Sequence, residues 1–166
     1  MSQTDIVLKI SNGLDGESQL EGYANHIDIQ SFSWGVSNQA TFSSSNTAGG
    51  GAGKAHVHSL AMTKTIDKSS PQLFWHCATG KHLENAQLFV HRAAGDKKIL
   101  YFKLDMKKVF VTSYSPGSGG GSGVLIGESF ALDFEEMEMT YWPQNSDGSQ
   151  GGAIPKKYNA AKGVGV

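Results

Sequence analysis

The sequence predicts a mainly β domain in which antiparallel strands are accompanied by one flanking α-helix. Apolar residues alternate with polar ones along several stretches, as expected for strands that bury one face. In three of these stretches the apolar face changes partway along, which indicates a β-bulge or a bend. Only residues 69–80 combine a helix start signal with a helix stop signal.

The changes of face predict how the strands are used. In the two longest stretches the apolar residues move from even to odd positions: Leu100, Phe102, Leu104 and Met106, then Val109 and Val111; and Phe130, Leu132 and Phe134, then Met137, Met139 and Tyr141. The stretch from Ile27 slips in the same way, because Phe32 and Trp34 follow Ile29. Strands of this kind pass from one sheet to another in a barrel or sandwich. A strand over residues 99–114 would extend about 50 Å, so we expect part of it to meet a partner.

The first half of the chain supplies three further elements. Residues 5–10 alternate around Ile6, Leu8 and Ile10 and predict a short strand. A second strand is predicted over residues 26–37. A polar, glycine-rich loop then covers residues 38–54, and a strand resumes over residues 56–66.

The predicted helix has conventional ends. Ser69 or Ser70 fits the N-cap, Pro71 fits the first helical position and Gly80 fits the position after the last turn. A helix of about ten residues is too short to be stable alone, so we expect it to pack on the sheet. The side chains expected to face the sheet are Leu73, Phe74 and Cys77.

The second half of the chain predicts strands joined by turns. Strands are expected over three ranges: 86–92, 99–114 and 125–142. Residues 94–96 can form the first hairpin turn, and the glycine-rich residues 115–123 join the two longest strands. Residues 145–152 are rich in turn formers, and residues 153–158 predict a short edge strand.

Composition limits the possible functions. A chain of 166 residues predicts one domain over residues 1–166, large enough to bury a core. The lone Cys77 excludes an internal disulfide and a cysteine zinc site. The net charge of −1 argues against nucleic acid and against an anionic bilayer as partners. Residues 1–5 lack the charged and apolar regions of a signal peptide, so none is expected.

The glycine-rich loop does not fit a phosphate-binding motif. Ala48 stands where a P-loop has its first glycine, and Ala55 stands where it has Ser or Thr after Lys54. A predicted strand follows, so there is no helix N-terminus to hold a phosphate. We therefore interpret the loop as an interaction arm.

Two residue clusters raise the possibility of an enzyme or a metal protein. His56 and His58 would share one strand face and could form a two-ligand metal site, which His26 or His91 could join, yet no His-Glu-x-x-His element and no cysteine partner supports it. Glu135, Glu136 and Glu138 could form a glycosidase carboxylate pair, although a solvated strip at a bulge is the favoured interpretation. No serine lies in a nucleophile elbow, so we expect no catalytic residue, no cofactor and no metal.

One strand face is small, polar and uncharged, and it consists of Ser31, Ser33, Gly35 and Ser37. Such a face suits a surface on which other molecules rest or slide without binding strongly. The opposite face carries Phe32 and Trp34. Stacking of nucleic-acid bases on them is one possibility, but the net charge favours packing into the core.

A set of short motifs, in a specific order, resembles a known family. The motifs are Asp15-Gly16-Glu17-Ser18, Ile27-Asp28-Ile29 leading to Ser33-Trp34-Gly35, Gly51-Ala52-Gly53-Lys54, the run from Thr63 to Pro71, Gly80-Lys81-His82, Glu128-Ser129, and Pro143-Gln144 before Asp147-Gly148. Together they resemble the Hcp family, the haemolysin-coregulated proteins that form the inner tube of bacterial type VI secretion systems. The likeness runs from about Asp5 to Gly148.

The resemblance implies two antiparallel sheets that form a β-barrel or sandwich with a helix on its flank. It also implies homohexameric rings that stack into a hollow tube inside a contractile sheath, capped by a VgrG-like spike. Effector proteins would travel in the lumen, and the tube would leave the cytoplasm without a signal peptide. The protein would not be an enzyme. A tail-tube protein of another phage-like contractile machine is the alternative.

Site residues follow from the resemblance as expectations. Ser31, Ser33, Gly35 and Ser37 are expected to line the lumen. The loop residues expected to contact a neighbouring subunit or ring are Thr47, Gly49, Gly50, Gly51, Gly53 and Lys54. Nothing distinctive in the resemblance extends past Ala153, so residues 153–166 are expected to be mobile.

Overall fold

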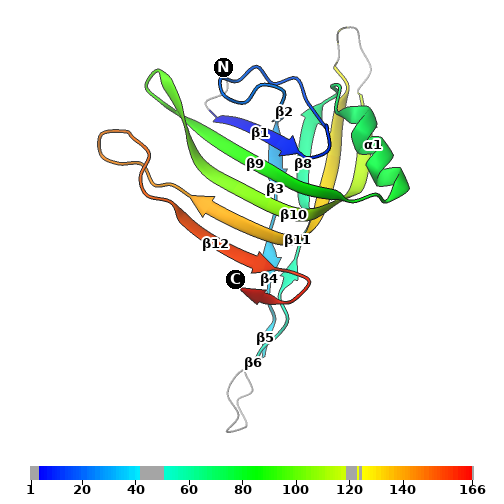
Figure 1. Ribbon diagram of the computed structural model, residues 1–166, viewed down its shortest axis with the longest axis vertical. Coiled ribbons are helices and arrows are strands. Elements are labelled where there is room, and N and C mark those ends of the chain that lie inside the picture. Colours follow the sequence, from blue (N-terminus) through cyan, green and yellow to red (C-terminus); the bar gives the residue numbers. More distant parts are fainter. Residues whose placement is uncertain (1–3, 42–50, 119–122, 124, 166) are drawn as a thin grey trace.

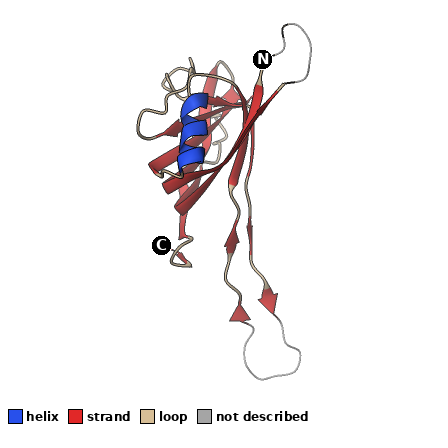
Figure 2. Ribbon diagram, turned by 90° about the vertical axis from the view of Figure 1, so that its right-hand side faces the viewer, coloured by secondary structure: helices blue, strands red, loops and turns tan. Residues whose placement is uncertain are grey.

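The computed structural model describes residues 4–41, 51–118, 123 and 125–165 of the chain. These residues form an antiparallel β-sandwich with one helix on its flank and a narrow arm that projects from one end (Figures 1 and 2). The elements, in chain order, are β1 (Thr4–Ile10), β2 (Ile27–Ile29), β3 (Ser31–Ser33), β4 (Val36–Ser37), β5 (Ala40–Thr41), β6 (Gly51–Ala52), β7 (His56–Val57), β8 (Leu60–Thr65), α1 (Ser70–Thr79), β9 (Leu83–Ala94), β10 (Lys97–Gly117), β11 (Gly127–Tyr141), β12 (Ile154–Asn159) and β13 (Val164–Gly165).

The strand order confirms the predicted fold class. Seven strands lie in the order β13-β12-β11-β10-β9-β1-β2, and all their pairings are antiparallel. β8 pairs with the first half of β11, and β3 pairs with β8, which forms the second layer. Within the described part of the chain no ladder joins β2 to β3, so the structure is a sandwich and not a fully closed barrel.

The core lies between the two layers. It is built from the alternating apolar positions of the strands, among them Leu8, Leu60, Leu88, Leu104 and Phe130, all of which are fully or almost fully buried. The strand predicted for residues 5–10 is therefore confirmed as β1, with Leu8 and Ile10 in the core and Ile6 packed against it, but Val7, predicted on the polar face, is also buried. Burial of such side chains is the main favourable contribution to folding, at about 25 cal/mol per Å² of apolar surface.

The predicted change of face is present in β10, and in β11 as far as the buried Met137; Met139 and Tyr141, predicted on the same face, are 37% and 42% exposed. Both strands change at one place, which we call the crossing: residues 107–109 of β10 and 134–136 of β11. Leu104 and Met106 are buried in the first part of β10, whereas Val109 is buried after the change. Between them, Lys108 adopts a left-handed backbone with φ of 51°. Lys107 pairs with Glu136 and Val109 pairs with Phe134, so the matching slip in β11 lies directly opposite. At this crossing β11 exchanges its neighbour β8 for β12, and the sheet divides.

The slip after Ile29 also marks a change of layer. Ile27 and Ile29 of β2 pair with β1, whereas β3 pairs with β8. Gln30 lies between the two short strands, and its backbone N–H donates to the Thr63 carbonyl at 2.8 Å. The single strand predicted over residues 26–37 is therefore three short strands, because the chain passes from one layer to the other and then into the arm.

The helix ends where the sequence predicts, but one of its predicted buried residues is wrong. Gly80 is left-handed with φ of 67°, and its N–H donates to the His76 carbonyl at 3.1 Å. Leu73 is buried and Cys77 packs against the core, as expected. Phe74 is 59% exposed and His76 is buried instead, because the i, i+3 pair faces the sheet and the next position turns away. This ten-residue helix is too short to cross a membrane.

The N-cap works differently from the prediction. Ser69 occupies the N-cap position, but its side chain makes no bond to the helix backbone. Its hydroxyl and its N–H both bind the Asp67 carboxylate, at 2.5 and 2.9 Å. The turn before the helix is thus held by an aspartate that the sequence analysis had not singled out.

The arm contains part of the predicted loop. β4 pairs with β7, and β5 pairs with β6, so the two chain segments run side by side away from the sandwich (Figure 2). The Gly53 N–H donates to the Gln39 carbonyl at 3.0 Å. A Cβ at Gly53 would lie 2.6 Å from that same oxygen, so only glycine permits this close approach.

The C-terminal segment belongs to the sheet. β12 pairs with the second half of β11, which confirms the strand predicted over residues 153–158 but not its predicted place at the edge of the sheet. β13 then pairs with β12 through Tyr158 and Asn159. The sequence analysis missed β13, because Gly163 and Gly165 flank only one apolar residue and give no alternation.

Candidate functional site

A broad surface of small, uncharged side chains covers the solvent side of four paired strands, β3, β8, β11 and the end of β10. Register places its residues in two rows across the sheet: Ser31, Thr63, Ser129 and Ser115; and Ser33, Ala61, Ala131 and Ser113. All are exposed except Ala131, which is half-buried. The hydroxyls of Ser31 and Thr63 lie 2.5 Å apart, which links two neighbouring strands. We call these eight residues the small polar face.

Two of the four predicted lumen residues lie on the small polar face, and two lie beyond it. Ser31 and Ser33 open the two rows. Gly35 follows β3, where its carbonyl accepts the His58 N–H at 3.0 Å, and Ser37 lies in β4 at the base of the arm. The other six residues were not identified in the sequence analysis. The exposed alternate positions of residues 60–65 could have indicated Ala61 and Thr63, but no local pattern shows which strands lie beside them.

The opposite side of β3 packs inward, as the sequence analysis favoured. Phe32 stacks on Phe102 with ring centroids 6.1 Å apart, and Trp34 packs against Phe134 at 6.4 Å. Both aromatic residues contact the core cluster. The two faces of β3 therefore have separate roles, one for packing and one for contact with solvent or a partner.

The residues predicted to contact a neighbouring subunit lie along the arm. Gly51 is in β6, Gly53 binds Gln39 as described above, and Lys54 is exposed. Thr47, Gly49 and Gly50 lie outside the described residues.

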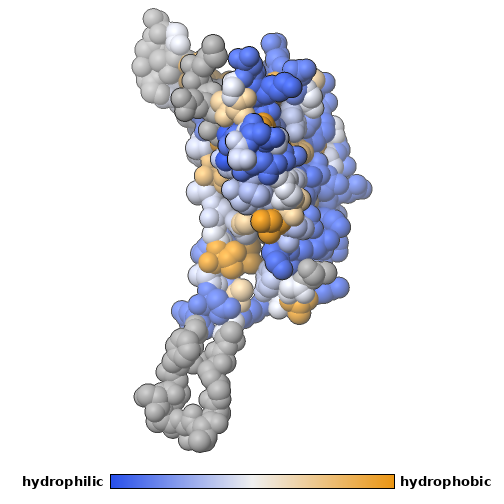
Figure 3. Space-filling model, turned by 90° about the vertical axis from the view of Figure 1, so that its left-hand side faces the viewer, coloured by the Kyte–Doolittle hydropathy of each residue, from blue (hydrophilic) through white to orange (hydrophobic). Residues whose placement is uncertain are grey.

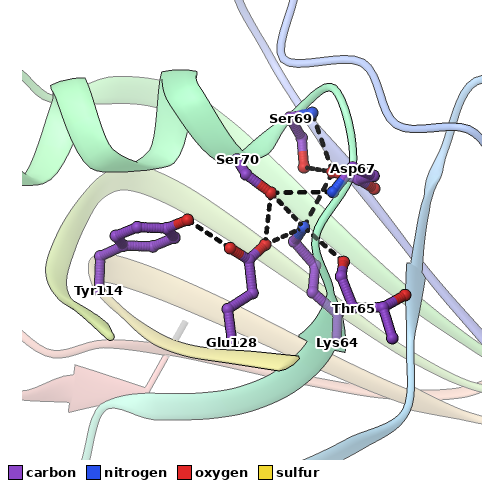
Figure 4. Close-up of polar contacts among 7 residues, drawn as sticks. All are labelled: Lys64, Thr65, Asp67, Ser69, Ser70, Tyr114 and Glu128. Atoms are coloured by element: carbon purple, nitrogen blue, oxygen red, sulfur yellow. Dashed lines mark hydrogen bonds and ion pairs between the residues drawn. The ribbon is translucent and has the colours of Figure 1, made fainter. Parts of the chain in front are cut away.

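A buried polar cluster lies where the helix begins (Figure 4). The Lys64 ammonium is completely buried and forms ion pairs with Glu128 and, at 2.9 Å, with Asp67. The Ser70 hydroxyl donates to Glu128 at 2.7 Å and accepts from Lys64 at 3.2 Å. The Tyr114 hydroxyl donates to the other carboxylate oxygen of Glu128. Burial, together with the adjacent Glu128, raises the pKa of Tyr114 to about 12.

This cluster holds the groups that a hydrolase would use, but its position favours a structural role. Ser70 is 2% exposed, and the side chains of Lys64 and Glu128 are completely buried, so a substrate cannot reach them. The Ser70 hydroxyl is also engaged by the Asp67 N–H at 3.0 Å. Ser70 at the helix start is thus joined to Lys64 of β8 and Glu128 of β11, and Glu128 is joined to Tyr114 of β10.

The carboxylates at the strand crossing do not fit the glycosidase hypothesis. Glu135 binds Lys108 at 2.8 Å, and Glu136 binds Lys157 at 2.9 Å. In each pair the hydrogen bond from the lysine lowers the pKa of the carboxyl below its ordinary range. A glycosidase needs one carboxyl with a raised pKa to act as the general acid, and these two are shifted the other way. The crossing is a solvated strip of ion pairs, as the sequence analysis favoured.

The four histidines that the metal hypothesis involves lie in two separate places. The rings of His56 and His58 are 4.8 Å apart at the base of the arm. His26 and His91 instead flank Tyr23, with ring centroids 5.2 and 4.5 Å from it. In the part of the chain that the structure describes, no group of three His, Cys, Asp or Glu side chains could hold a metal ion. A pair of histidines falls short of the three protein ligands of a catalytic zinc site.

Comparisons with known proteins agree with one another. The sequence model of the family described as "Type VI secretion system effector, Hcp" matches residues 7–141. The chain is 38% identical over 154 residues to Protein hcp1 of Pseudomonas aeruginosa, covering 93% of this chain and 92% of that protein.

Solved structures show the same likeness. A protein described as a type six secretion system protein superimposes with a TM-score of 0.87 at 29% identity, covering 98% of this chain and 99% of the other. Hcp1 of Salmonella typhimurium gives a TM-score of 0.77 at 27% identity, covering 99% and 100%. A chain of the anti-feeding prophage baseplate gives a TM-score of 0.51 at 12% identity, covering 84% and 93%, and shares the fold alone.

Proposed function

Because the chain belongs to the Hcp family of type VI secretion proteins, we propose that it is the subunit of a hexameric ring whose copies stack into a hollow tube. The observation that carries this proposal is the small polar face. Its eight residues extend over four hydrogen-bonded strands without a charged side chain, on a sheet whose other side is the core. The face ends at Asp133, the next exposed position of β11 on this side, whose carboxylate accepts the Ser59 hydroxyl at 2.5 Å. A rigid, neutral wall of this kind suits the lumen of a conveying tube.

The lumen residues are Ser31 and Ser33, with Gly35 and Ser37 continuing toward the base of the arm. Short hydroxyl side chains offer hydrogen bonds to a passing protein, yet they have neither the charge nor the length to hold it strongly. Effector proteins are the proposed cargo. The work of the molecule is mechanical, with no catalytic residue and no cofactor.

The arm supplies the contact with a neighbouring subunit or ring, through Gly51, Gly53 and Lys54 and through the predicted Thr47, Gly49 and Gly50. Fixing the backbone of one residue costs about 1–2 kcal/mol, so a glycine-rich contact forms weakly in dilute solution. The sheath and a VgrG-like spike are the proposed partners that start the stack. The subunit is made in the cytoplasm and exported as part of the type VI tube.

A tail tube of another phage-like contractile machine remains the second candidate. The likeness to the prophage baseplate supports a fold common to both machines. The 38% identity to Protein hcp1 favours the type VI assignment.

Electron microscopy and native mass spectrometry of the purified protein test the proposal. We expect hollow six-fold rings of about 106 kDa, six times the 17.7 kDa mass of the chain. A single monomeric species at high concentration would contradict it.

A further inference from the structure

An apolar groove lies where the arm joins the sandwich. It encloses about 250 Å³ and is lined mainly by apolar side chains, among them Trp34, Val36, Val57, Phe134, Met139 and Tyr158. In the space-filling view, hydrophobic residues gather just above the arm (Figure 3). Small-molecule sites usually enclose about 300–1,000 Å³, so the groove is better matched to a few protein side chains than to a cofactor.

The groove has the properties of an uncovered core. Val36 is 51% exposed and Met139 is 37% exposed. The Trp34 indole N–H is buried yet has no hydrogen-bond partner, and a buried donor in this state costs about 1–3 kcal/mol. The cause lies in the sheet, because β11 continues with β12 beyond the end of its pairing with β8. One layer of the sandwich therefore extends past the other.

A second apolar surface lies at the opposite end of the molecule. It consists of Ile66, Leu125 and Ile126, which are 46%, 73% and 40% exposed, and we call it the apolar knob. The Ile66 N–H donates to the Ile126 carbonyl at 2.9 Å, which holds the two segments together. Ile66 directly follows β8 and Leu125 precedes β11. These strand ends point away from the arm (Figure 1).

We infer that the apolar knob of one copy inserts into the apolar groove of the copy in the next ring. The inference rests on the proposed ring stacking and identifies the surfaces that perform it. The two surfaces differ, so the contact between them is heterologous. They lie at the two ends of the strands that carry the small polar face, and not at the β3 and β10 edges of that face, so in the proposed tube they face the rings above and below.

The size of the contact explains why the occupant is a ring and not a free subunit. The knob has three residues, far fewer than the about 20–30 residues that each partner contributes to a stable protein interface. One knob and one groove would therefore separate readily. Six identical contacts between two rings act together, because each contact that forms raises the effective concentration of the others.

Charge substitutions at each end test the inference. We expect native mass spectrometry to show intact rings for both Leu125→Asp and Val36→Asp. Tube formation, measured by sedimentation of concentrated rings, should fall at least tenfold in both. Phe74→Asp is the matched control, since Phe74 is 59% exposed on the flanking helix, and it should leave both readouts unchanged.

Cysteine cross-linking tests which copies are in contact. In a Cys77→Ser background, rings of Val36→Cys are mixed with rings of Leu125→Cys and oxidised. A disulfide requires Cα atoms within about 7 Å, so we expect cross-linked tubes from the mixture and none from either ring population alone.

The outcomes separate the two proposals. Absence of rings in the unsubstituted protein would refute the proposed function. Intact rings that stack normally with Leu125→Asp, or with Val36→Asp, would overturn the knob-and-groove contact and leave the tube function standing. Cross-links within isolated rings of the double variant Val36→Cys/Leu125→Cys, before any stacking, would show a lateral contact and would also overturn it.

Discussion

At the scale of single residues, burial decides what a charged group can do. Ser70, Lys64 and Glu128 bring a hydroxyl, an ammonium and a carboxylate into contact, yet these groups lie at the start of a helix with no access from solvent. An accessible arrangement of this kind would indicate chemistry. A sealed one holds the helix, β8 and β11 in one geometry.

The first prediction concerns this ion pair. Glu128→Leu leaves the Lys64 ammonium buried without its main partner, so the free energy of unfolding should fall by about 3–5 kcal/mol. The double variant Lys64→Met/Glu128→Leu removes both charges and should recover most of the loss. Urea unfolding at one fixed protein concentration measures both. A double variant as unstable as the single one would contradict this account.

The second prediction concerns pH. Burial, and then the nearby His26, lowers the pKa of His91 from its ordinary value of 6.5. The unfolded chain therefore binds the proton more readily, and stability present above pH 6.5 is lost as the pH falls through the lower, folded pKa. Other charged groups around the same pocket are Glu21, Asp96, Lys97 and Lys98.

His91→Gln should make the unfolding free energy less dependent on pH below 6.5. Urea unfolding at several pH values measures this, and His82→Gln, at an exposed histidine, is the control. Equal pH dependence in His91→Gln and the unsubstituted protein would exclude His91 as the cause. The lowered carboxyl pKa values of Glu135 and Glu136 have the same sign but act only in a more acidic range.

At the scale of elements, the crossing of β10 and β11 decides the shape of the sheet. Lys108 has a φ of 51°, a conformation that costs a side-chain-bearing residue roughly 1–2 kcal/mol. Its ion pair with Glu135 lies on the surface and contributes little. The packing of the buried residues on both sides of the crossing imposes this conformation.

The third prediction follows from that conformation. Lys108→Val should lower the unfolding free energy by about 1–2 kcal/mol, because a β-branched residue tolerates a positive φ poorly. Lys108→Gly should be neutral or stabilising, since glycine adopts this backbone freely. Lys107→Val is the control at the neighbouring exposed position. Thermal unfolding that ranks Val above Gly at position 108 would refute the interpretation.

The fourth prediction concerns the arm. Deletion of residues 47–53 should leave ring formation intact and reduce tube assembly and secretion, because it removes the proposed contact with a neighbour. Native mass spectrometry and a secretion assay provide the two readouts. Normal secretion by the deletion variant would show that the arm is only a spacer and makes no contact that secretion requires.

At the scale of the whole molecule, function depends on which surfaces the fold brings together. Ser33 and Ser113 are 80 positions apart in the chain, yet they belong to one row of the small polar face, through Ala61 and Ala131. The apolar knob and the apolar groove lie at opposite ends of the same sandwich. A subunit with one uniform wall and two complementary ends can line a channel and extend it.

The fifth prediction tests the wall. Ser33→Glu and Ser129→Glu should each leave rings intact but reduce effector retention by a similar factor, because both place a charge on the same face. Co-purification of several effectors with the rings measures retention, and Glu84→Gln at an exposed site off this face is the control. Unchanged retention across all effectors in both variants would remove the small polar face from the lumen.

The sequence by itself determined the longer strands, the helix ends and the family. Alternation and its slips depend only on near neighbours in the chain, so β1, β8, β10 and β11 and the crossing near Lys108 could be predicted. The same local rule misplaced Phe74, because the side of a helix that faces the sheet depends on the docking angle.

Only the tertiary structure decided how the strands are paired, and therefore which surfaces exist. Ser129 and Thr63 become neighbours through a backbone ladder between residues far apart in the chain, and no periodicity encodes that pairing. The burial of Lys64 with Glu128, and the open groove beside Trp34, likewise arise from how two layers of unequal length are stacked. Local sequence sets the conformation of each segment, whereas long-range packing sets what each segment faces.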